Sequence, residues 1–214
     1  MNFDIRTTIL TIPAILIGFT IHEYAHAYTA DKLGDKTPKF QGRLTLNPFA
    51  HIDWMGLLMI LLFRFGWAKP VEINPSAFKH YYKDDFKVSF AGPLSNLITA
   101  FIFAILTEVF MKFELIGGTA NTVSGIMQSI LAYIIYINCM LFVFNLIPLP
   151  GLDGFHMLRD LFPRQFYKIS NFMYTYQMIL LIVFIISPLS YYLVSVPSGF
   201  LFELFLRIGS FIFR

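Results

Sequence analysis

The sequence is poor in charge, because Asp, Glu, Lys and Arg make up only 14% of its 214 residues, against about 25% in soluble domains. A single cysteine, Cys139, excludes a disulfide within the chain. The net charge is only +3 and no basic run occurs, so we expect no nucleic-acid binding. Hydrophobic residues account for 57% of the chain, a composition that indicates a membrane protein.

Three stretches are long and apolar enough to cross a bilayer as helices. They are residues 88–111, with Glu108 as the one charge, residues 122–148 and residues 171–197. Residues 9–30 would also qualify, except that they carry His22, Glu23 and His26. Ionisable groups inside a membrane helix are costly and indicate function; the alternative is a polar cluster at a helix end that faces water.

The pattern predicts one membrane-embedded domain over residues 1–214, with an all-α polytopic fold of four to five transmembrane helices. A first helix over residues 5–33 stops near Gly34. Later helices are expected at residues 93–111, 123–147 and 167–196, the last one kinked or ended at Pro188. Residues 200–213 fit either a short span or an in-plane helix.

Two shorter segments follow the first helix. Residues 42–48, Gly-Arg-Leu-Thr-Leu-Asn-Pro, alternate like a short β-strand. This strand could offer an edge to an extended peptide or serve only as a structural hairpin. Residues 54–65 are apolar but too short to span, which fits a re-entrant or interfacial segment.

The basic residues predict the topology. If residues 54–65 do not cross, 12 of the 16 Lys and Arg residues lie on one side, which the positive-inside rule makes cytosolic. Arg6 and Lys112 lie opposite, while Arg207 and Arg214 are not assigned. The crowded side contains Lys32, Lys36, Lys39, Arg43, Arg64, Lys69, Lys79, Lys83, Lys87, Arg159, Arg164 and Lys168.

His22-Glu23-Tyr24-Ala25-His26 is the most informative motif in the chain. At helical spacing the two histidines lie one turn apart on one face, so both imidazoles can reach the same ion. Glu23 is rotated by about 100° from His22, close enough to hold a water at that ion. HExxH is the zinc-protease arrangement, in which the carboxylate acts as general base.

A catalytic zinc needs a third protein ligand. Asp153 follows residues 145–151, where two prolines and a glycine unwind the chain. Such backbone is tolerated at membrane depth only where it is buried in protein or lines a cavity. Alternatively, Asp153 caps the next helix. His156 is a rival ligand, and iron or cobalt could replace zinc on two imidazoles and a carboxylate.

The chain resembles the site-2 protease family of intramembrane zinc metalloproteases. The resemblance rests on the HExxH motif, on residues 42–48, on Ala91-Gly92-Pro93-Leu94-Ser95-Asn96, and on the segment from Asn145 to Gly154. It implies that His22, His26 and Asp153 hold Zn²⁺, that Glu23 activates water, and that Asn145 supports substrate or transition state. The chain has no room for the PDZ or CBS domains that many relatives carry.

Asn96 has two interpretations, because its amide needs a partner in an apolar helix. It either binds substrate near the metal or holds helices together, as we also expect of Asn138. The resemblance further implies a membrane-protein substrate. With the basic residues, it predicts a multi-pass protein of a prokaryotic plasma membrane, whose active site opens to the cytosol.

Two other functions compete with proteolysis. A membrane metal-ion transporter would need ionisable ligands on neighbouring helices to relay ions, whereas residues 93–111 and 123–147 offer only Glu108. A catalytically silent membrane-binding relative would not require Glu23.

Overall fold

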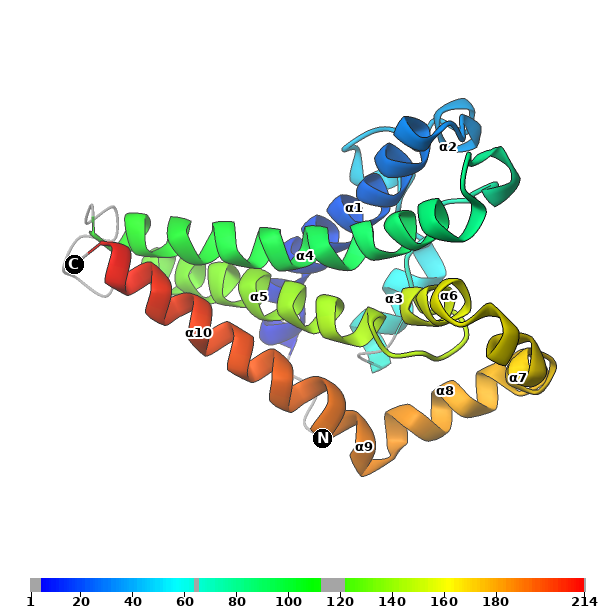
Figure 1. Cartoon of the computed structure of the whole chain (residues 1–214). Coiled ribbons are helices and arrows are strands. Elements are labelled where there is room, and N and C mark those ends of the chain that lie inside the picture. Colours follow the sequence, from blue (N-terminus) through cyan, green and yellow to red (C-terminus); the bar gives the residue numbers. More distant parts are fainter. Residues whose placement is uncertain (1–4, 64–65, 113–121, 214) are drawn as a thin grey trace.

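The computed structural model describes residues 5–63, 66–112 and 122–213, most of which are helical (Figure 1). Four helical stretches are long and apolar enough to cross a membrane. They are α1 (Ile5–Leu33), α4 (Tyr81–Lys112), α5 (Thr122–Asn145) and a last stretch, Pro188–Ile212, that ends in α10 (Val196–Ile212). The predicted all-α polytopic membrane fold is confirmed.

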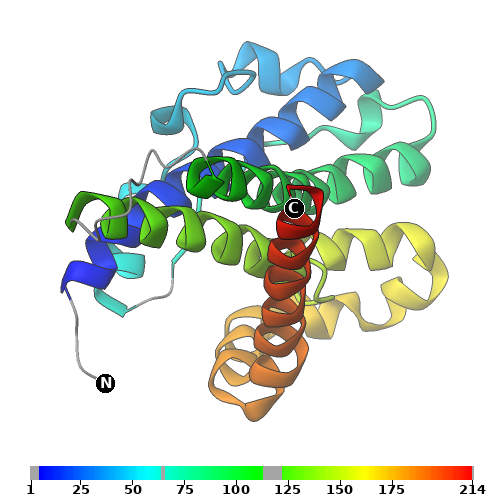
Figure 2. The ribbon, with the colours of Figure 1, turned by 90° about the vertical axis from the view of Figure 1, so that its left-hand side faces the viewer.

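Three of these helices form the centre of the molecule. α1, α4 and α5 pack against one another, and α1 crosses the other two at an angle (Figures 1 and 2). Ala100 and Ala104 of α4 are fully buried against Ile135 and Cys139 of α5 and Phe205 of α10. Small residues at such contacts let helix backbones approach closely, which is how membrane helices associate.

The remaining helices are short. α2 (Thr37–Phe40) and α3 (Trp54–Phe63) lie between α1 and α4. α6 (Asp153–Leu161), α7 (Pro163–Thr175), α8 (Gln177–Ile186) and α9 (Pro188–Ser190) lie between α5 and α10. The ten residues of α3 are too few to span, as expected, although residues 64–65 of that segment lie outside the described residues.

The helix ends indicate four crossings. Lys112 Nζ at the end of α4 donates a hydrogen bond to the carbonyl of Phe213, just after α10. Arg159 of α6 forms an ion pair with Asp85, near the start of α4. The chain between α6 and the end of α10 therefore makes one net crossing, and the pair α7–α8, bent by 83°, adds no complete span of its own.

The helix expected over residues 167–196 is interrupted at Pro188, as predicted, but it is wrong in lacking a second break at Tyr176. The chain bends at Tyr176, and α8 ends before Pro188, which begins the next helix. Phe155 of α6 packs against the rings of Phe166 and Tyr174, at centroid distances of 4.7 and 5.3 Å. This contact keeps α7 beside α6, and residues 200–213 become the second half of the last span.

The structure corrects two other predictions, a strand after α2 and the start of α4. Residues 42–46 do not form a strand, because Gly42 (φ 68°) reverses the backbone and Arg43 points inward instead of alternating across a sheet. α4 begins twelve residues before Pro93, which lies inside the helix and not at its start. Gly34, with φ 113°, ends α1 as predicted.

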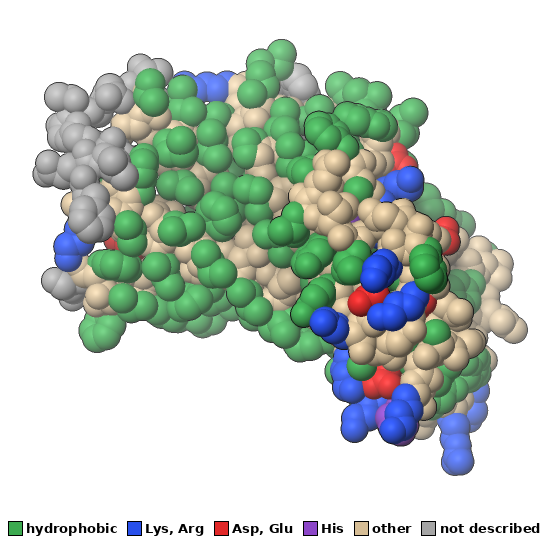
Figure 3. Space-filling model, turned by 90° about the horizontal axis from the view of Figure 1, so that it is seen from above, with side chains coloured by type: hydrophobic (Ala, Val, Ile, Leu, Met, Phe, Trp, Pro, Cys, Tyr) green, Lys and Arg blue, Asp and Glu red, His purple; other side chains and the backbone are tan. Residues whose placement is uncertain are grey.

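Charge is distributed unevenly over the surface. Apolar side chains cover much of one face, whereas Lys and Arg side chains gather at the end where α4 begins (Figure 3). Arg207 lies near the end of α10 and so belongs with Lys112 at the opposite end. Arg64 and Arg214 lie outside the described residues.

This arrangement predicts which positions face the cytosol. In a Cys139→Ala background, K83C and K168C should react with a membrane-impermeant maleimide only after cells are opened. S210C should react in intact cells, because the positive-inside rule places the Lys-rich end in the cytosol. All three positions are exposed, so labelling of K83C in intact cells would reverse the topology.

Candidate metal centre

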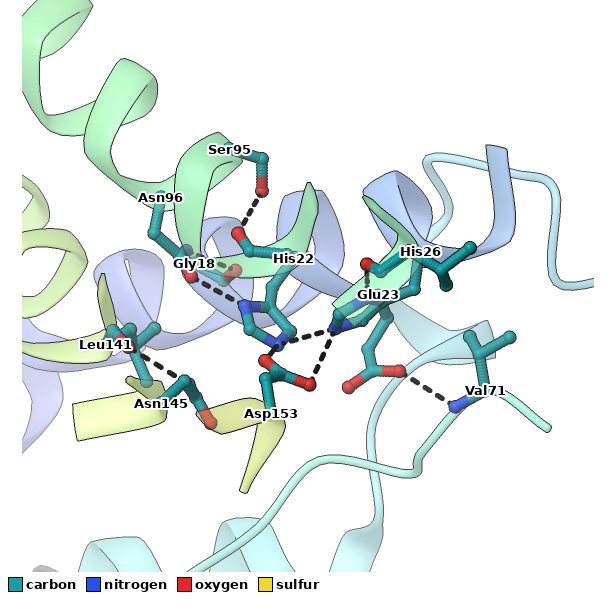
Figure 4. A network of polar contacts seen from close by, with 12 residues as sticks. Gly18, His22, Glu23, His26, Val71, Ser95, Asn96, Leu141, Asn145 and Asp153 are labelled. Carbon is teal, nitrogen blue, oxygen red and sulfur yellow. Dashed lines mark hydrogen bonds and ion pairs between the residues drawn. The ribbon is translucent and has the colours of Figure 1, made fainter. Parts of the chain in front are cut away.

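Two histidines and a glutamate of α1 lie in the interior of the molecule. His22, Glu23 and His26 expose only 7%, 7% and 8% of their surfaces. One helical turn separates the two histidines, so both rings project from the same face. Their Nε2 atoms are 3.0 Å apart (Figure 4).

Asp153 reaches the same place from another part of the chain. α5 ends at Asn145, and the backbone stays outside α-helical geometry until α6 begins at Asp153. The Asp153 carboxylate places Oδ2 3.1 Å from His22 Nε2 and Oδ1 3.3 Å from His26 Nε2. The N-cap of α6 is Leu152, so the alternative interpretation of Asp153 as a helix cap is wrong.

The distances among the three side chains fit a tetrahedral metal. Their ligand atoms lie within 4.8 Å of one another, and no other such group of His, Cys, Asp and Glu occurs in the described part of the chain. Ligands about 2.05 Å from a tetrahedral zinc are about 3.3 Å apart, close to the separations of 3.0 to 3.3 Å here. Asp153 Oδ2 is also buried and receives no hydrogen bond.

The hydrogen bonds of the imidazoles explain why no donor reaches that oxygen. His22 Nδ1 lies 2.7 Å from Asn96 Oδ1, and His26 Nδ1 lies 2.7 Å from the carbonyl oxygen of Val88. Both partners are acceptors, so each Nδ1 carries a proton, and in the neutral imidazole each Nε2 then keeps its lone pair. Two lone pairs and a carboxylate thus face one point, which is the donor set of a metal site and not of a hydrogen-bonded cluster.

A chain of amides fixes the orientation of His22. Asn138 Nδ2 donates to the carbonyl of Ile134, which turns its oxygen towards Asn96. Asn96 Nδ2 donates to Asn138 Oδ1 and to the carbonyl of Gly18, at 2.9 and 3.0 Å, which turns Oδ1 towards His22. Both amides are fully buried, so backbone carbonyls at two points determine the imidazole tautomer.

Gly92 allows α4 to lie against the two imidazoles. A Cβ at this position would overlap the His26 ring and come within 2.7 Å of His22 Cε1. Gly154 has a similar role at the start of α6, where a Cβ would meet the carbonyl groups of Leu146 and Ile147. Both glycines are therefore needed for close approach.

Glu23 points towards the same site from α1. Its Oε2 accepts a hydrogen bond of 2.8 Å from the backbone N–H of Val71. The other carboxylate oxygen is directed towards the side of His26 and Asp153 (Figure 4). This placement suits a carboxylate that exchanges a proton with a molecule at the metal.

The other candidate residues have different environments. Asn145 lies near Asp153 (Figure 4), and its Nδ2 donates to the carbonyl of Leu141 within α5. His156 lies outside the convergent group, and burial lowers its pKa. The substrate-supporting roles of Asn96 and Asn145 stay predictions, whereas Asn138 links α4 to α5 as expected.

Sequence reasoning missed the groups that orient the site. The backbone carbonyl of Val88 and the backbone N–H of Val71 carry no residue-specific signal. Gly92 belongs to a motif noted in the sequence, but its contact with the histidines requires the helix–helix geometry. Arg43 was assigned to the basic side of the membrane and to the expected strand at residues 42–48, although 95% of its surface is buried.

Comparison with known proteins identifies the family. Residues 10–186 match the sequence profile of peptidase family M50. The chain belongs to this family. M50 is the site-2 protease family, so the resemblance noted in the sequence is confirmed.

Curated relatives of this M50 chain carry concordant names. "Putative zinc metalloprotease YwhC" of Bacillus subtilis is 42% identical over 83% of this chain and 80% of its own length. "Putative zinc metalloprotease Rip2" of Mycolicibacterium smegmatis is 31% identical over 70% of this chain but 56% of its own length. "Putative zinc metalloprotease MJ0611" of Methanocaldococcus jannaschii is 26% identical over 74% of this chain and 73% of its own length.

No solved structure matches this chain significantly. Family membership and the names of the relatives support a metalloprotease, and they support zinc as its metal.

Gly92→Ala should empty the metal centre of this M50 chain. The added methyl group must displace both imidazoles, since its neighbours are ring atoms and not flexible side-chain ends. Zinc in purified protein, measured by mass spectrometry, should fall from about one per chain to well below half. Gly199→Ala is the matched control, because a Cβ there meets nothing within 4 Å; equal zinc in both variants would contradict this account.

Asn96→Leu should weaken zinc binding by about 10- to 100-fold, the usual effect of removing a hydrogen-bond partner of a metal-ligating histidine. The reason is that His22 loses the acceptor that fixes its tautomer. Competition with a chelator measures the affinity. Thr99→Val is the control on the same helix, because the Thr99 hydroxyl only bonds the carbonyl of Ser95; an unchanged affinity in Asn96→Leu would remove Asn96 from the site.

Proposed function

We propose that this M50 protein is an intramembrane zinc metalloendopeptidase that hydrolyses peptide bonds in or near transmembrane segments of other membrane proteins. One observation carries the proposal. His22, His26 and Asp153 converge beside Glu23, and the motif lies inside a helix long enough to span the membrane.

The position of the motif along α1 supports cleavage below the membrane surface. His26 lies seven residues before the end of α1 at Leu33 (33 minus 26). At 1.5 Å per residue this is about 10 Å, roughly a third of the thickness of the hydrocarbon core. We expect the site to open towards the cytosolic face of a prokaryotic plasma membrane, because the basic residues crowd that end.

The residues divide the chemistry among themselves. His22, His26 and Asp153 would hold the ion, leaving a fourth position for water. A bound zinc would lower the pKa of that water to about 7 and polarise the scissile carbonyl group. Glu23 takes the proton from the attacking water and delivers it to the leaving amine.

The substrate must change conformation before it reacts. A transmembrane helix hides its carbonyl groups in backbone hydrogen bonds, so the segment to be cut must unwind at the site. Asn145, the last residue of α5 before the non-helical segment, is well placed to support the extended substrate or the transition state near Asp153.

Transport of metal ions is less well supported. A relay across the membrane would need several ligand groups along its path. Within the described residues the convergent group at His22 is the only one, and Glu108 of α4 is not part of it. A silent membrane-binding relative would have no use for the carboxylate of Glu23 beside the site.

Glu23→Gln should abolish cleavage but keep the metal. General-base catalysis contributes about 10²- to 10⁴-fold, so kcat should fall by at least about 100-fold, while zinc content stays at the wild-type level. The assay uses purified protein in detergent. Its substrates are single-pass proteins that carry different transmembrane segments between two soluble tags, and cleavage is read on gels.

Asp31→Asn serves as a control, because Asp31 bonds only to Lys36 near the end of the same helix. Full activity in Glu23→Gln would contradict the proposed role of the base. Zinc flux into liposomes without cleavage of any substrate would favour transport.

A further inference from the structure

Arg43 is a buried cation that the proposed chemistry does not use. Its side chain donates hydrogen bonds to the carbonyl groups of Ala50, Lys69 and Pro70, the last at 2.7 Å. It forms no ion pair with any carboxylate in the described part of the chain. Burying a charge without a direct ion pair is expensive. Three carbonyl groups from two loops compensate for part of the lost hydration, and Glu23 and Glu72 act on the charge from further away.

These bonds join the loop after α2 to the loop before α4. Further contacts run alongside them. The Lys69 N–H donates to the carbonyl of His51 at 2.9 Å, and Ile52 forms an isolated antiparallel bridge with Ala68. The chain at Lys69 and Pro70 is therefore held from one side by several bonds, two of which come from Arg43.

A second anchor lies a few residues further along. The N–H of Asn74 donates to Asp35 Oδ2 at 2.7 Å, and Asp35 is 1% exposed at the end of α1. Val71 thus lies between two fixed points. Its own N–H donates to Glu23 Oε2 at 2.8 Å.

This hydrogen bond restricts the carboxylate of Glu23. One oxygen is occupied by the N–H of Val71, and the other is directed to the side of His26 and Asp153 (Figure 4). A carboxylate on a long side chain otherwise samples several rotamers, and a misplacement of 1 Å can cost about 100-fold in rate.

We propose that Arg43 is a positioning residue that holds the N–H of Val71 against Glu23 and so aims the proposed general base at the metal centre. The inference rests on the proposed function. It gives a role to Gly42-Arg43, the part of the sequence motif that was expected to form a strand.

The direct test removes the single N–H. Val71→Pro deletes the donor, whereas Val71→Ala keeps it and trims the side chain. Arg43→Gln removes the anchor, and Asp31→Asn, which loses only the side-chain bond to Lys36 away from this loop, is its control. The kinetic measurements use a tagged single-pass substrate that the wild type cleaves.

Val71→Pro and Arg43→Gln should lower kcat by about 10- to 100-fold, while KM and zinc content stay within about twofold. Both controls should keep the wild-type kcat. A wild-type kcat in Arg43→Gln would overturn the inference, as would a loss of kcat together with loss of zinc.

Hydrogen exchange provides a test that needs neither a substrate nor a folded Val71→Pro protein. The Val71 amide should exchange slowly in the wild type, and about 10-fold or more faster in Glu23→Ala and in Arg43→Gln. Fast exchange in the wild type would overturn the inference. An active Glu23→Gln would instead contradict the proposed function, so the two failures are distinguishable.

Discussion

Two hydrogen bonds from imidazole N–H groups to α4 determine the metal centre. His22 donates to Asn96 and His26 to the carbonyl of Val88, which directs both Nε2 lone pairs to the point that Asp153 approaches. These bonds require α4 to lie directly against α1, and Gly92 makes that approach possible. The packing of α4 against α1 therefore positions the metal ligands, and α5 contributes through the hydrogen bond between Asn138 and Asn96.

The hydrogen bonds that link Asn138, Asn96 and His22 lie inside an apolar helix bundle, which offers few other hydrogen-bond partners. A buried amide without a partner costs about 1–3 kcal/mol in proteins. The side-chain amides of Asn138 and Asn96 are therefore held in the orientation that makes the hydrogen bonds leading to His22. The carboxylate is different, since Asp153 Oδ2 receives no hydrogen bond. A cation is the group that would satisfy it, which makes the metal part of the stability of the site as well as of its chemistry.

The sequence predicted those features that depend on local spacing. The HExxH register and the end of α1 at Gly34 follow from helical periodicity and from the position of the glycine. The choice of Asp153 over a helix cap or His156 rested on the resemblance to the site-2 protease family, and the structure brings its carboxylate to the histidines. Features that depend on tertiary contacts were missed. The bend at Tyr176 reflects the contact of Phe155 with Phe166 and Tyr174. The strand expected at residues 42–48 does not form, and Arg43 points inward instead.

The proposed metal centre requires three side chains, from α1 and α6, to share one ion. X-ray absorption at the zinc edge of purified protein tests it most directly. The account predicts four light ligands at about 2.0–2.2 Å, two of them with the multiple-scattering signature of imidazole. Asp153→Asn should alter this shell while both imidazoles remain. A spectrum with fewer than two imidazoles, or one that is identical in Asp153→Asn, would contradict the account.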